Sequence, residues 1–251
     1  MECVAYDQFL NLERDHWWFV GRRRSYFAIL EHFLPNREGL AIADIGCGVG
    51  GMLPGLNAFG RPVGVDSDLH SIKICRERGF PNSFVGGADF LPLKTGSHDL
   101  VTFFDCLEHL DDDQGALAEV HRVLRPGGTA FFSVPAYQFL FSNNDTVAHH
   151  KRRYTRSGLV RKVRQAGLTV EKATYVNVTL FPLILPAVLL LKLKERLFPK
   201  PNDTRSNLTH RPGKLANSLL GAVFGGEGRI LRYISAPLGH SLVLVARKPK
   251  Q

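Results

Sequence analysis

Residues 40–51 read LAIADIGCGVGG, a short apolar run followed by a turn with four glycines. This pattern predicts a buried strand that enters a tight turn and then a helix. Gly46, Gly48 and Gly51 match the G-x-G-x-x-G fingerprint, and Asp66 follows Gly46 by 20 residues, where an acid that binds ribose hydroxyls belongs. Glycines let a cofactor approach the backbone closely. The stretch therefore predicts a binding site for a nucleoside cofactor.

The same pattern continues along the chain. Further strands are expected at 62–66, 83–85, 98–104, 130–134, 169–178 and 241–247. Strands that alternate with helices, such as the one expected at 117–124, predict an α/β fold with a doubly wound, mostly parallel seven-stranded sheet. The segment between the last two strands is far longer than a hairpin requires. We therefore expect one domain over 1–251, with an N-terminal helical lid (1–38), a core (39–179 plus 237–251) and an inserted helical cap (180–236).

Asp44 distinguishes between two kinds of cofactor. It lies two residues before Gly46, and a carboxylate there would repel the pyrophosphate of a dinucleotide. The same carboxylate suits S-adenosylmethionine (SAM), which carries an ammonium and a sulfonium group.

Residues 40–135 resemble the class I SAM-dependent methyltransferases at motif level. The resemblance lies in the first motif at 44–50, in Asp66, in Ala88-Asp89, and in the LRPGG segment at 124–128 before the fifth strand. It implies a Rossmann-like fold, SAM as the cofactor and S-adenosylhomocysteine as the product. Asp44 and the backbone near Gly46 would hold the methionine amino group.

The resemblance also implies roles for other residues. Asp66, with Ser67 beside it, would hold the ribose, and Asp89 would bind the adenine amino group with Phe90 beside the ring. Asp105 and Cys106 would line the site near the sulfonium, although Asp105 could instead cap a helix. The full set expected at the cofactor is Asp44, Gly46, Cys47, Gly48, Gly50, Asp66, Ser67, Asp89, Phe90, Asp105 and Cys106.

Two outer segments resemble a bacterial and archaeal subgroup of these enzymes. They are HWWFVGRRR at 16–24 and HKRRYT at 150–155. The tryptophans could cover the cofactor, and the arginines could pair with an anionic substrate. The expected substrate contacts are Trp17, Trp18, Arg22, Arg23, Arg152, Arg153 and Tyr154. The alternatives are aromatic anchors in the core and a solvated run of charges.

A neutral histidine suits the role of general base near pH 7. His149 and His150 follow the fifth strand, at the edge where α/β proteins bind ligands, and His109 is a third candidate. His109 could equally be a packing residue. Asp111, Asp112 and Asp113 are expected to begin a helix, and no metal site is expected.

Direct in-line methyl transfer needs mainly alignment of the reacting atoms and exclusion of water. We expect O-methylation of a small acceptor that contains a sugar or a phosphate or is linked to a lipid or glycan. One alternative is an NAD(P)-dependent oxidoreductase or epimerase on a similar sheet. Another is a non-catalytic protein that binds SAM or nucleic acid, although no nucleic-acid motif is visible.

The net charge of +9 favours an anionic partner without specifying it. No basic start with an apolar run opens the chain, so we expect a cytoplasmic protein with reduced thiols. The apolar run at 180–191 has 12 residues, and a membrane span needs about 20. Lys192, Lys194 and Arg196 follow it, so 180–198 could lie peripherally on the inner face of a membrane. Regular helix is expected only after Pro182 and Pro186.

Overall fold

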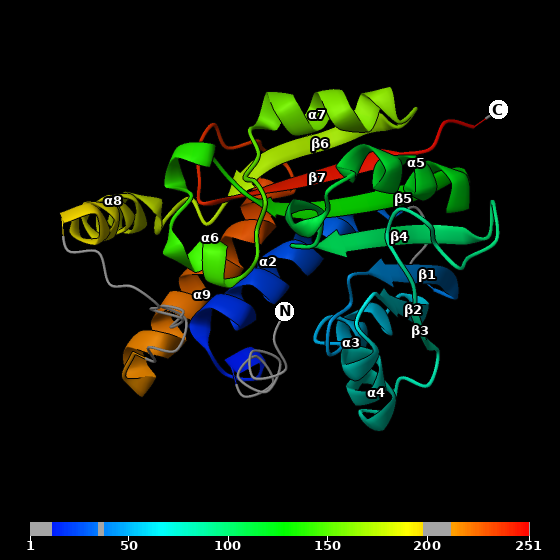
Figure 1. Cartoon of the computed structure of the whole chain (residues 1–251), viewed down its shortest axis with the longest axis horizontal. Helices are drawn as coiled ribbons and strands as arrows, with labels where there is room; N and C mark the ends of the chain where they lie inside the picture. The colour runs from blue at the N-terminus through cyan, green and yellow to red at the C-terminus, as the bar shows by residue number, and fades with distance from the viewer. Residues whose placement is uncertain (1–11, 35–37, 198–211, 251) are drawn as a thin grey trace.

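The computed structural model describes residues 12–34, 38–197 and 212–250, and these form one sheet with helices packed around it (Figure 1). Within the described residues the sheet has seven strands in the order β3-β2-β1-β4-β5-β7-β6. The strands are β1 (Leu40–Ile45), β2 (Gly60–Asp66), β3 (Ser83–Val85), β4 (His98–Phe104), β5 (Leu124–Pro135), β6 (Thr169–Val176) and β7 (Ser241–Arg247). The first five run parallel, and β7 is antiparallel to both β5 and β6.

Helices connect the strands. The α-helices are α2 (Trp17–Phe33), α3 (Leu53–Leu56), α4 (Leu69–Glu77), α5 (Asp113–Val123), α6 (Asn143–Val147), α7 (Arg156–Gln165), α8 (Phe181–Leu197) and α9 (Lys214–Leu231). Two short 3-10 helices are η1 (Leu107–His109) and η2 (Gln138–Leu140). The expected α/β fold with a mostly parallel, Rossmann-like sheet is confirmed. Asp112 caps α5 by accepting from the backbone N–H of Gly115, as the acidic run at 111–113 indicated.

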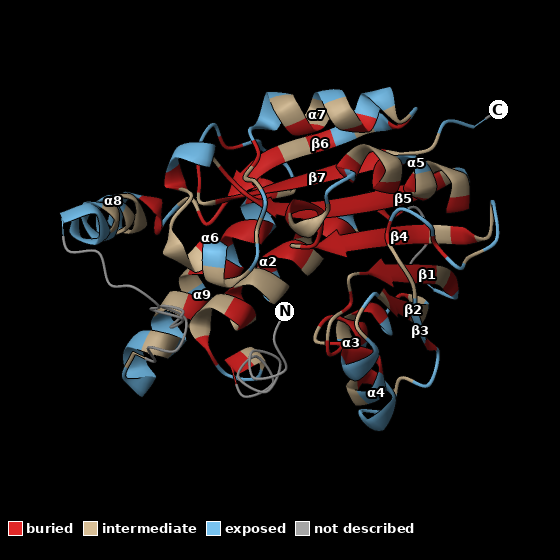
Figure 2. Cartoon of the chain, viewed as in Figure 1, coloured by how far each residue is buried: buried red, intermediate tan, exposed pale blue. Residues whose placement is uncertain are grey.

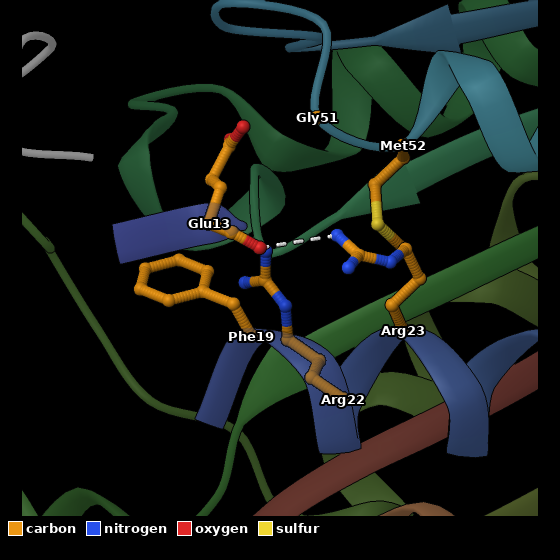
Figure 3. Close-up of a pocket in the computed structure, with 6 residues that line it drawn as sticks. All are labelled: Glu13, Phe19, Arg22, Arg23, Gly51 and Met52. Atoms are coloured by element: carbon orange, nitrogen blue, oxygen red, sulfur yellow. Dashed lines mark hydrogen bonds between the residues drawn. The ribbon is translucent and has the colours of Figure 1, made fainter. Parts of the chain in front are cut away.

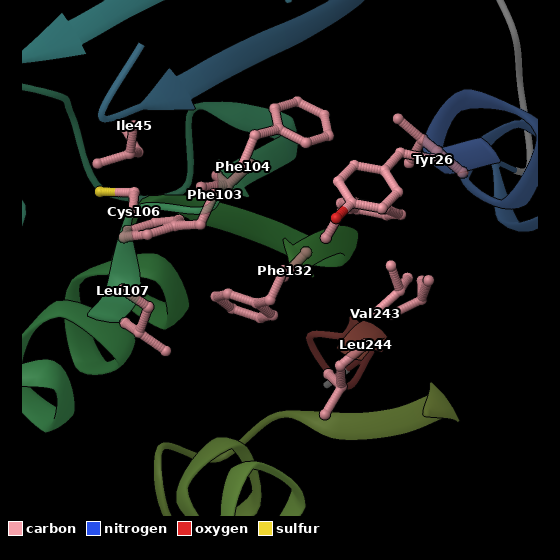
Figure 4. Close-up of a cluster of buried hydrophobic side chains, with 14 of the residues drawn as sticks. Tyr26, Ile45, Phe103, Phe104, Cys106, Leu107, Phe132, Val243 and Leu244 are labelled. Carbon is pink, nitrogen blue, oxygen red and sulfur yellow. The ribbon is translucent and has the colours of Figure 1, made fainter. Parts of the chain in front are cut away.

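The core lies on both faces of the sheet, where the central strands β1, β4, β5 and β7 are buried along most of their length (Figure 2). Tyr26 of α2 stacks on Phe104 with their ring centroids 6.2 Å apart, and it also contacts Phe131 (Figure 4). Because side chains alternate along a strand, Phe103 and Phe132 point to the other face, where their rings are 5.6 Å apart. Helix α2, which belongs to the expected lid, is therefore part of the core.

The two helices expected in the cap at 180–236 differ in their packing. Helix α9 lies along α2 (Figure 1), and the approach is close enough that a Cβ on Gly228 would meet the backbone of Ser25. Glu227 of α9 is buried and accepts hydrogen bonds from the backbone N–H groups of Asn177 and Val178 at the end of β6. This half of the insertion is thus joined to the body of the domain.

Helix α8 projects from the end of the sheet where β6 ends, and most of it is exposed (Figures 1 and 2). It begins at Phe181, so the expectation that helix starts only after Pro182 and Pro186 was wrong. Pro182 stands in the first turn, where a missing N–H is tolerated, and Pro186 is accommodated inside the helix. None of the described helices is long and apolar enough to cross a membrane.

Candidate active site

The glycine turn, residues 46–51, links β1 to α3 at the carboxyl edge of the sheet. Gly46 (φ +70°), Gly48 (φ +53°) and Gly50 (φ +82°) adopt left-handed backbone conformations that favour glycine. A Cβ on Gly46 would also overlap the side chain of Cys106, whereas one on Gly48 would meet nothing within 4 Å. The turn at Gly46 is therefore set both by its backbone angles and by the close approach of the end of β4.

Asp66, at the end of β2, holds the glycine turn in place. Its two carboxylate oxygens accept from the backbone N–H groups of Gly48 (2.8 Å) and Asp68 (2.9 Å). Burial raises the pKa of Asp66, and these two hydrogen bonds oppose the shift. The carboxylate expected to bind ribose hydroxyls thus lies beside the glycines expected to admit the cofactor.

Asp44 is buried at the end of β1, with 2% of its surface exposed. The hydroxyl of Thr102 on β4 donates to it over 2.8 Å. Burial raises the pKa of Asp44 to about 7, against the opposing effect of that hydrogen bond. A cationic group placed beside it would favour the ionised form, which is the chemistry expected for the ammonium of SAM.

The remaining residues expected at the cofactor lie around the same edge. Ser67, Asp89 and Phe90 are exposed, and Phe90 has 82% of its surface open, so its ring is available for a flat ligand to stack on. Cys47 and Cys106 are buried. Burial raises the pKa of the Cys106 thiol, so this side chain is an uncharged wall.

Asp105 joins the end of β4 to helix α2. Its carboxylate accepts from Arg22 over 2.6 Å and from the hydroxyl of Ser133 over 3.0 Å, and its backbone φ is +51°. The 3-10 helix that follows begins at Leu107 after Cys106, so Asp105 is not its N-cap. Arg22, expected to meet the substrate, is instead paired with a residue expected to lie near the sulfonium.

The segment before α2 lies against the glycine turn. Figure 3 shows Glu13, Phe19, Arg22 and Arg23 facing Gly51 and Met52 across a small depression. Arg23 donates to the backbone oxygen of Glu13 over 3.3 Å, and the Glu13 carboxylate pairs with Arg78 over 3.4 Å.

The two tryptophans of the expected lid lie elsewhere. Trp18 packs against Phe224 of α9 and against His240, with ring centroids 5.4 Å and 5.3 Å apart. The backbone N–H of Trp17 donates to the side chain of Asn217. Among the described residues, Glu13 and its neighbours therefore contact the glycine turn. The two tryptophans instead connect α2 to α9.

Glu108, His109 and His150, here called the histidine cluster, come together just beyond β4. One side-chain donor atom from each lies within 4.8 Å of the other two, and the two imidazole rings are 4.7 Å apart. Burial and the neighbouring His150 lower the pKa of His109 to about 4. His149 is exposed and has a φ of +59°, so of the two adjacent candidate bases it is His150 that joins His109.

Comparison with known proteins identifies the family of the domain. The family model described as "Methyltransferase domain" matches residues 43–132, which include the glycine turn, Asp66, Asp89 and His109 of η1. Residues 43–132 therefore form a methyltransferase domain, which confirms the resemblance to the class I SAM-dependent methyltransferases. The family match favours neither an oxidoreductase nor a non-catalytic binding protein, and SAM is the cofactor.

One sequence relative agrees with this assignment, and two solved structures share the fold. The "Probable S-adenosylmethionine-dependent methyltransferase" of Mycolicibacterium smegmatis is 29% identical over 166 residues, or 64% of this chain and 63% of that protein. A methyltransferase solved with the Haloferax volcanii Trm112 methyltransferase activator has a TM-score of 0.63 at 20% identity, covering 99% of this chain and 96% of the other. Phosphoethanolamine N-methyltransferase 2 of Haemonchus contortus, solved with SAM, has a TM-score of 0.58 at 20% identity, covering 98% and 60%. The chain spans less than half the length of three further relatives, which it matches at 34–37% identity.

Two residues of the 150–155 segment have buried partners in the methyltransferase domain. Arg153 donates to both carboxylate oxygens of Asp145, over 2.7 and 2.9 Å, and the hydroxyl of Tyr154 donates to Asp113 over 2.8 Å. Arg152 is half-buried and pairs with Asp113 over 3.3 Å. These side chains, expected to contact the substrate, tie the loop after β5 to α5 and α6.

Four residues of the site were not found by sequence reasoning: Thr102, Ser133, Asp145 and Glu108. Thr102 and Ser133 are small polar side chains inside apolar strands, which is the one sequence signal they offer. Asp145 holds no position in any quoted motif, although the Ser142–Asp145 spacing forms a capping box that could have placed it at a helix start.

Proposed function

We propose that this domain transfers the methyl group of SAM to a hydroxyl oxygen of a small acceptor that contains a sugar or a phosphate or is linked to a lipid or glycan. The observation that carries the proposal is the histidine cluster at the carboxyl edge of the sheet. A neutral amine can attack the SAM methyl unaided, whereas a hydroxyl must lose its proton as it reacts. The imidazole of His150, whose Nε2 faces the cluster, is placed to help with that proton.

The charge of the chain supports an anionic acceptor. The net charge is +9, and Lys151 and Arg152 stand directly beyond His150. Both are partly exposed, and Lys151 pairs with Asp111 before α5 while Arg152 pairs with Asp113, the first residue of α5. They form a rim of cationic side chains near the cluster. A phosphate on the acceptor would be attracted to such a rim.

The test is to incubate the purified chain with SAM labelled in its methyl group and with fractionated cell extract. We expect label in a small-molecule or lipid fraction, and nuclear magnetic resonance of the product should place it on an ether oxygen. Label on nitrogen or carbon, or label in nucleic acid, would contradict the proposed acceptor class. A chain with His109→Ala and His150→Ala provides the matched control and should transfer little label.

We further propose that α8 makes a peripheral contact with an anionic membrane surface, such as the inner face of a cell membrane. Its exposed apolar side chains are Leu183, Leu189, Leu190, Leu191, Leu193 and Leu197. Lys192, Lys194 and Arg196 lie among them, and each basic residue near an anionic surface contributes about 1 kcal/mol, an attraction that salt screens.

Co-sedimentation with vesicles tests this second proposal. We expect binding to vesicles that contain phosphatidylserine at low salt and weak binding to neutral vesicles. Leu189→Glu with Leu190→Glu should abolish it, and Ser157→Glu on the exposed surface of α7 is the control for added negative charge. A double variant that binds as well as the unchanged chain would contradict a membrane contact through α8.

A further inference from the structure

The histidine cluster carries a second kind of chemistry besides proton transfer. We propose that Glu108, His109 and His150 bind a divalent transition-metal ion. One carboxylate and two imidazoles offer donor atoms that all lie within 4.8 Å of one another, so small side-chain rotations would bring all three to one ion at the usual metal–ligand distance of about 2.0–2.2 Å. Glu108 and His109 come from η1, and His150 comes from the loop after α6, so the fold brings together ligands from two separate segments.

Glu108 supplies independent evidence for a positively charged ligand. Its side chain is fully buried, and no other residue in the described part of the chain donates a hydrogen bond to either of its carboxylate oxygens. A buried carboxylate without partners is costly to keep, and a bound cation removes that cost.

His150 is oriented as metal-binding histidines usually are. Its Nδ1 lies 2.9 Å from the Asp145 carboxylate, and its Nε2 faces Glu108, whose Oε1 is 3.9 Å away. That separation is too long for a hydrogen bond and leaves Nε2 available to an ion between the two groups. A carboxylate that binds the far nitrogen of a ligating histidine fixes its tautomer and its ring orientation.

Asp145 is itself held as an anion. Arg153 donates to both of its oxygens, and the backbone N–H of Ser142 donates to Oδ2. Although burial alone would raise the pKa of Asp145, hydrogen bonds from His150 and Arg153 bring it well below its usual range. His150 and Arg153 therefore share one partner: Arg153 positions the Asp145 carboxylate, and that carboxylate positions His150.

His109 completes the donor set. Its imidazole ring lies 4.7 Å from that of His150, and one of its nitrogens lies within 4.8 Å of donor atoms of both other residues. A hydrogen bond to the backbone of His149 engages the ring as well. Three protein ligands leave coordination positions open for an outside oxygen, as in catalytic metal sites.

The role of the ion, unlike the site itself, rests on the proposed O-methyl transfer. An acceptor hydroxyl bound to a divalent cation loses its proton to solvent water more readily than a free hydroxyl. The resulting oxygen anion forms a bond to the methyl carbon while the carbon–sulfur bond breaks, and the bonding pair remains on sulfur as S-adenosylhomocysteine leaves. The preferred acceptor would then present its reacting oxygen as a metal ligand.

Metal binding can be measured without any acceptor. The full chain, freed of metal by a chelator, is titrated with Zn²⁺ by calorimetry and with Co²⁺ by visible absorption. We expect one ion per chain, and Co²⁺ should develop d–d bands typical of mixed nitrogen and oxygen ligation. Glu108→Gln and His109→Ala should each weaken binding at least about 100-fold, and Asp145→Asn should weaken it about 10–100-fold. His149→Asn removes a neighbouring histidine at a left-handed position that asparagine tolerates, and it should leave the affinity unchanged.

SAM titration and thermal unfolding show whether each variant is folded, and Glu108→Gln keeps the shape of the side chain. No binding of Zn²⁺, Co²⁺ or Mn²⁺ to the unchanged chain overturns the inference, as does an affinity that all the ligand variants retain. The two proposals fail separately. O-methyl transfer that a chelator leaves intact refutes the ion's role, whereas one ion bound through this cluster beside a product methylated on nitrogen supports the site and refutes the proposed function.

Discussion

The glycine turn and the histidine cluster occupy the same edge of the sheet but are built in different ways. The glycine turn depends on backbone angles and on acids at the ends of β1 and β2, all within 23 residues of chain from Asp44 to Asp66. The histidine cluster depends on side chains from η1 and from the loop after α6, about 40 residues apart, and on the Asp145–Arg153 pair behind it. The first region is local in sequence, and the second is assembled by the fold.

The difference indicates how each region should respond to mutation. The glycine turn should tolerate few substitutions, because its shape is fixed by main-chain geometry and by the hydrogen bond that Asp66 accepts from Gly48. The histidine cluster can lose one side chain while the strands around it stay packed. Changes in the cluster should therefore separate catalysis from cofactor binding, and changes in the turn should not.

The largest effect is expected at His150. Replacing it with alanine should lower turnover about 10²–10⁴-fold, because a general base or a ligand that prepares the acceptor is lost. Steady-state kinetics with the acceptor measures this, and calorimetry should show SAM affinity within about twofold of the original. His121→Asn, which removes a histidine from α5, is the control. A loss of SAM affinity as large as the loss of turnover would show that the two regions are not separable.

Asp66 should have the next largest effect, and this effect should be on SAM affinity and not on turnover alone. Asp66→Ala should weaken SAM binding by about 2–4 kcal/mol, since charge-assisted hydrogen bonds contribute about 1.5–3 kcal/mol each. The same change frees the N–H of Gly48, which now donates to Asp66. Calorimetric titration with SAM measures the loss, and Asp68→Asn is the matched control at the next acid. Unchanged affinity in Asp66→Ala would place the ribose elsewhere.

The sequence predicted the parts of the molecule that depend on local patterns. Strands such as β1, β4 and β7 were placed at their observed bounds because apolar runs between turn residues indicate buried strands directly. The glycine turn could be predicted for the same reason. The sequence indicated helices in the segment 180–236 but not how they pack. The packing of α9 on α2 depends on small residues in two helices that lie 200 residues apart in the chain.

Side-chain roles that depend on distant partners could not be predicted. Nothing in the 150–155 segment shows that Arg153 pairs with Asp145 or that Tyr154 is buried on Asp113. From sequence alone, a run of cationic residues predicts a surface that binds anions. Only the structure shows that carboxylates of the same chain lie opposite these residues. Similarly, Glu108 has a sequence neighbourhood typical of a helix start, and its isolation in the core follows only from tertiary packing.

The two turn glycines differ in a way that stability measurements can detect. Gly46→Ala should lower the free energy of unfolding by about 2–5 kcal/mol, from the left-handed backbone (about 1–2 kcal/mol) and from overlap with Cys106 (about 1–3 kcal/mol). Gly48→Ala has open space for its Cβ and should lose only the first of these. Urea unfolding of both variants gives the comparison, and adding Cys106→Ala should recover part of the loss for Gly46 alone. Equal losses for the two glycines would mean that the approach of β4 does not constrain the turn.

The smallest effect concerns pH and Asp44. Burial raises the pKa of this carboxyl from 3.8 to about 7, so the folded protein without cofactor holds a proton there below neutrality. Its contribution to folding stability accordingly falls as pH rises between those two values, because the folded state binds more protons than the unfolded state. An ammonium group beside Asp44 favours the carboxylate, so SAM binding below pH 7 must release that proton. The affinity for SAM should therefore rise by up to about tenfold per pH unit from pH 5.5 to 7 and level off above it. Calorimetry across this range measures the slope, and Asp44→Asn, which cannot titrate, should bind more weakly with a flat profile. If the slope persists in Asp44→Asn, another group titrates, and Asp44 does not bind the ammonium group of the cofactor.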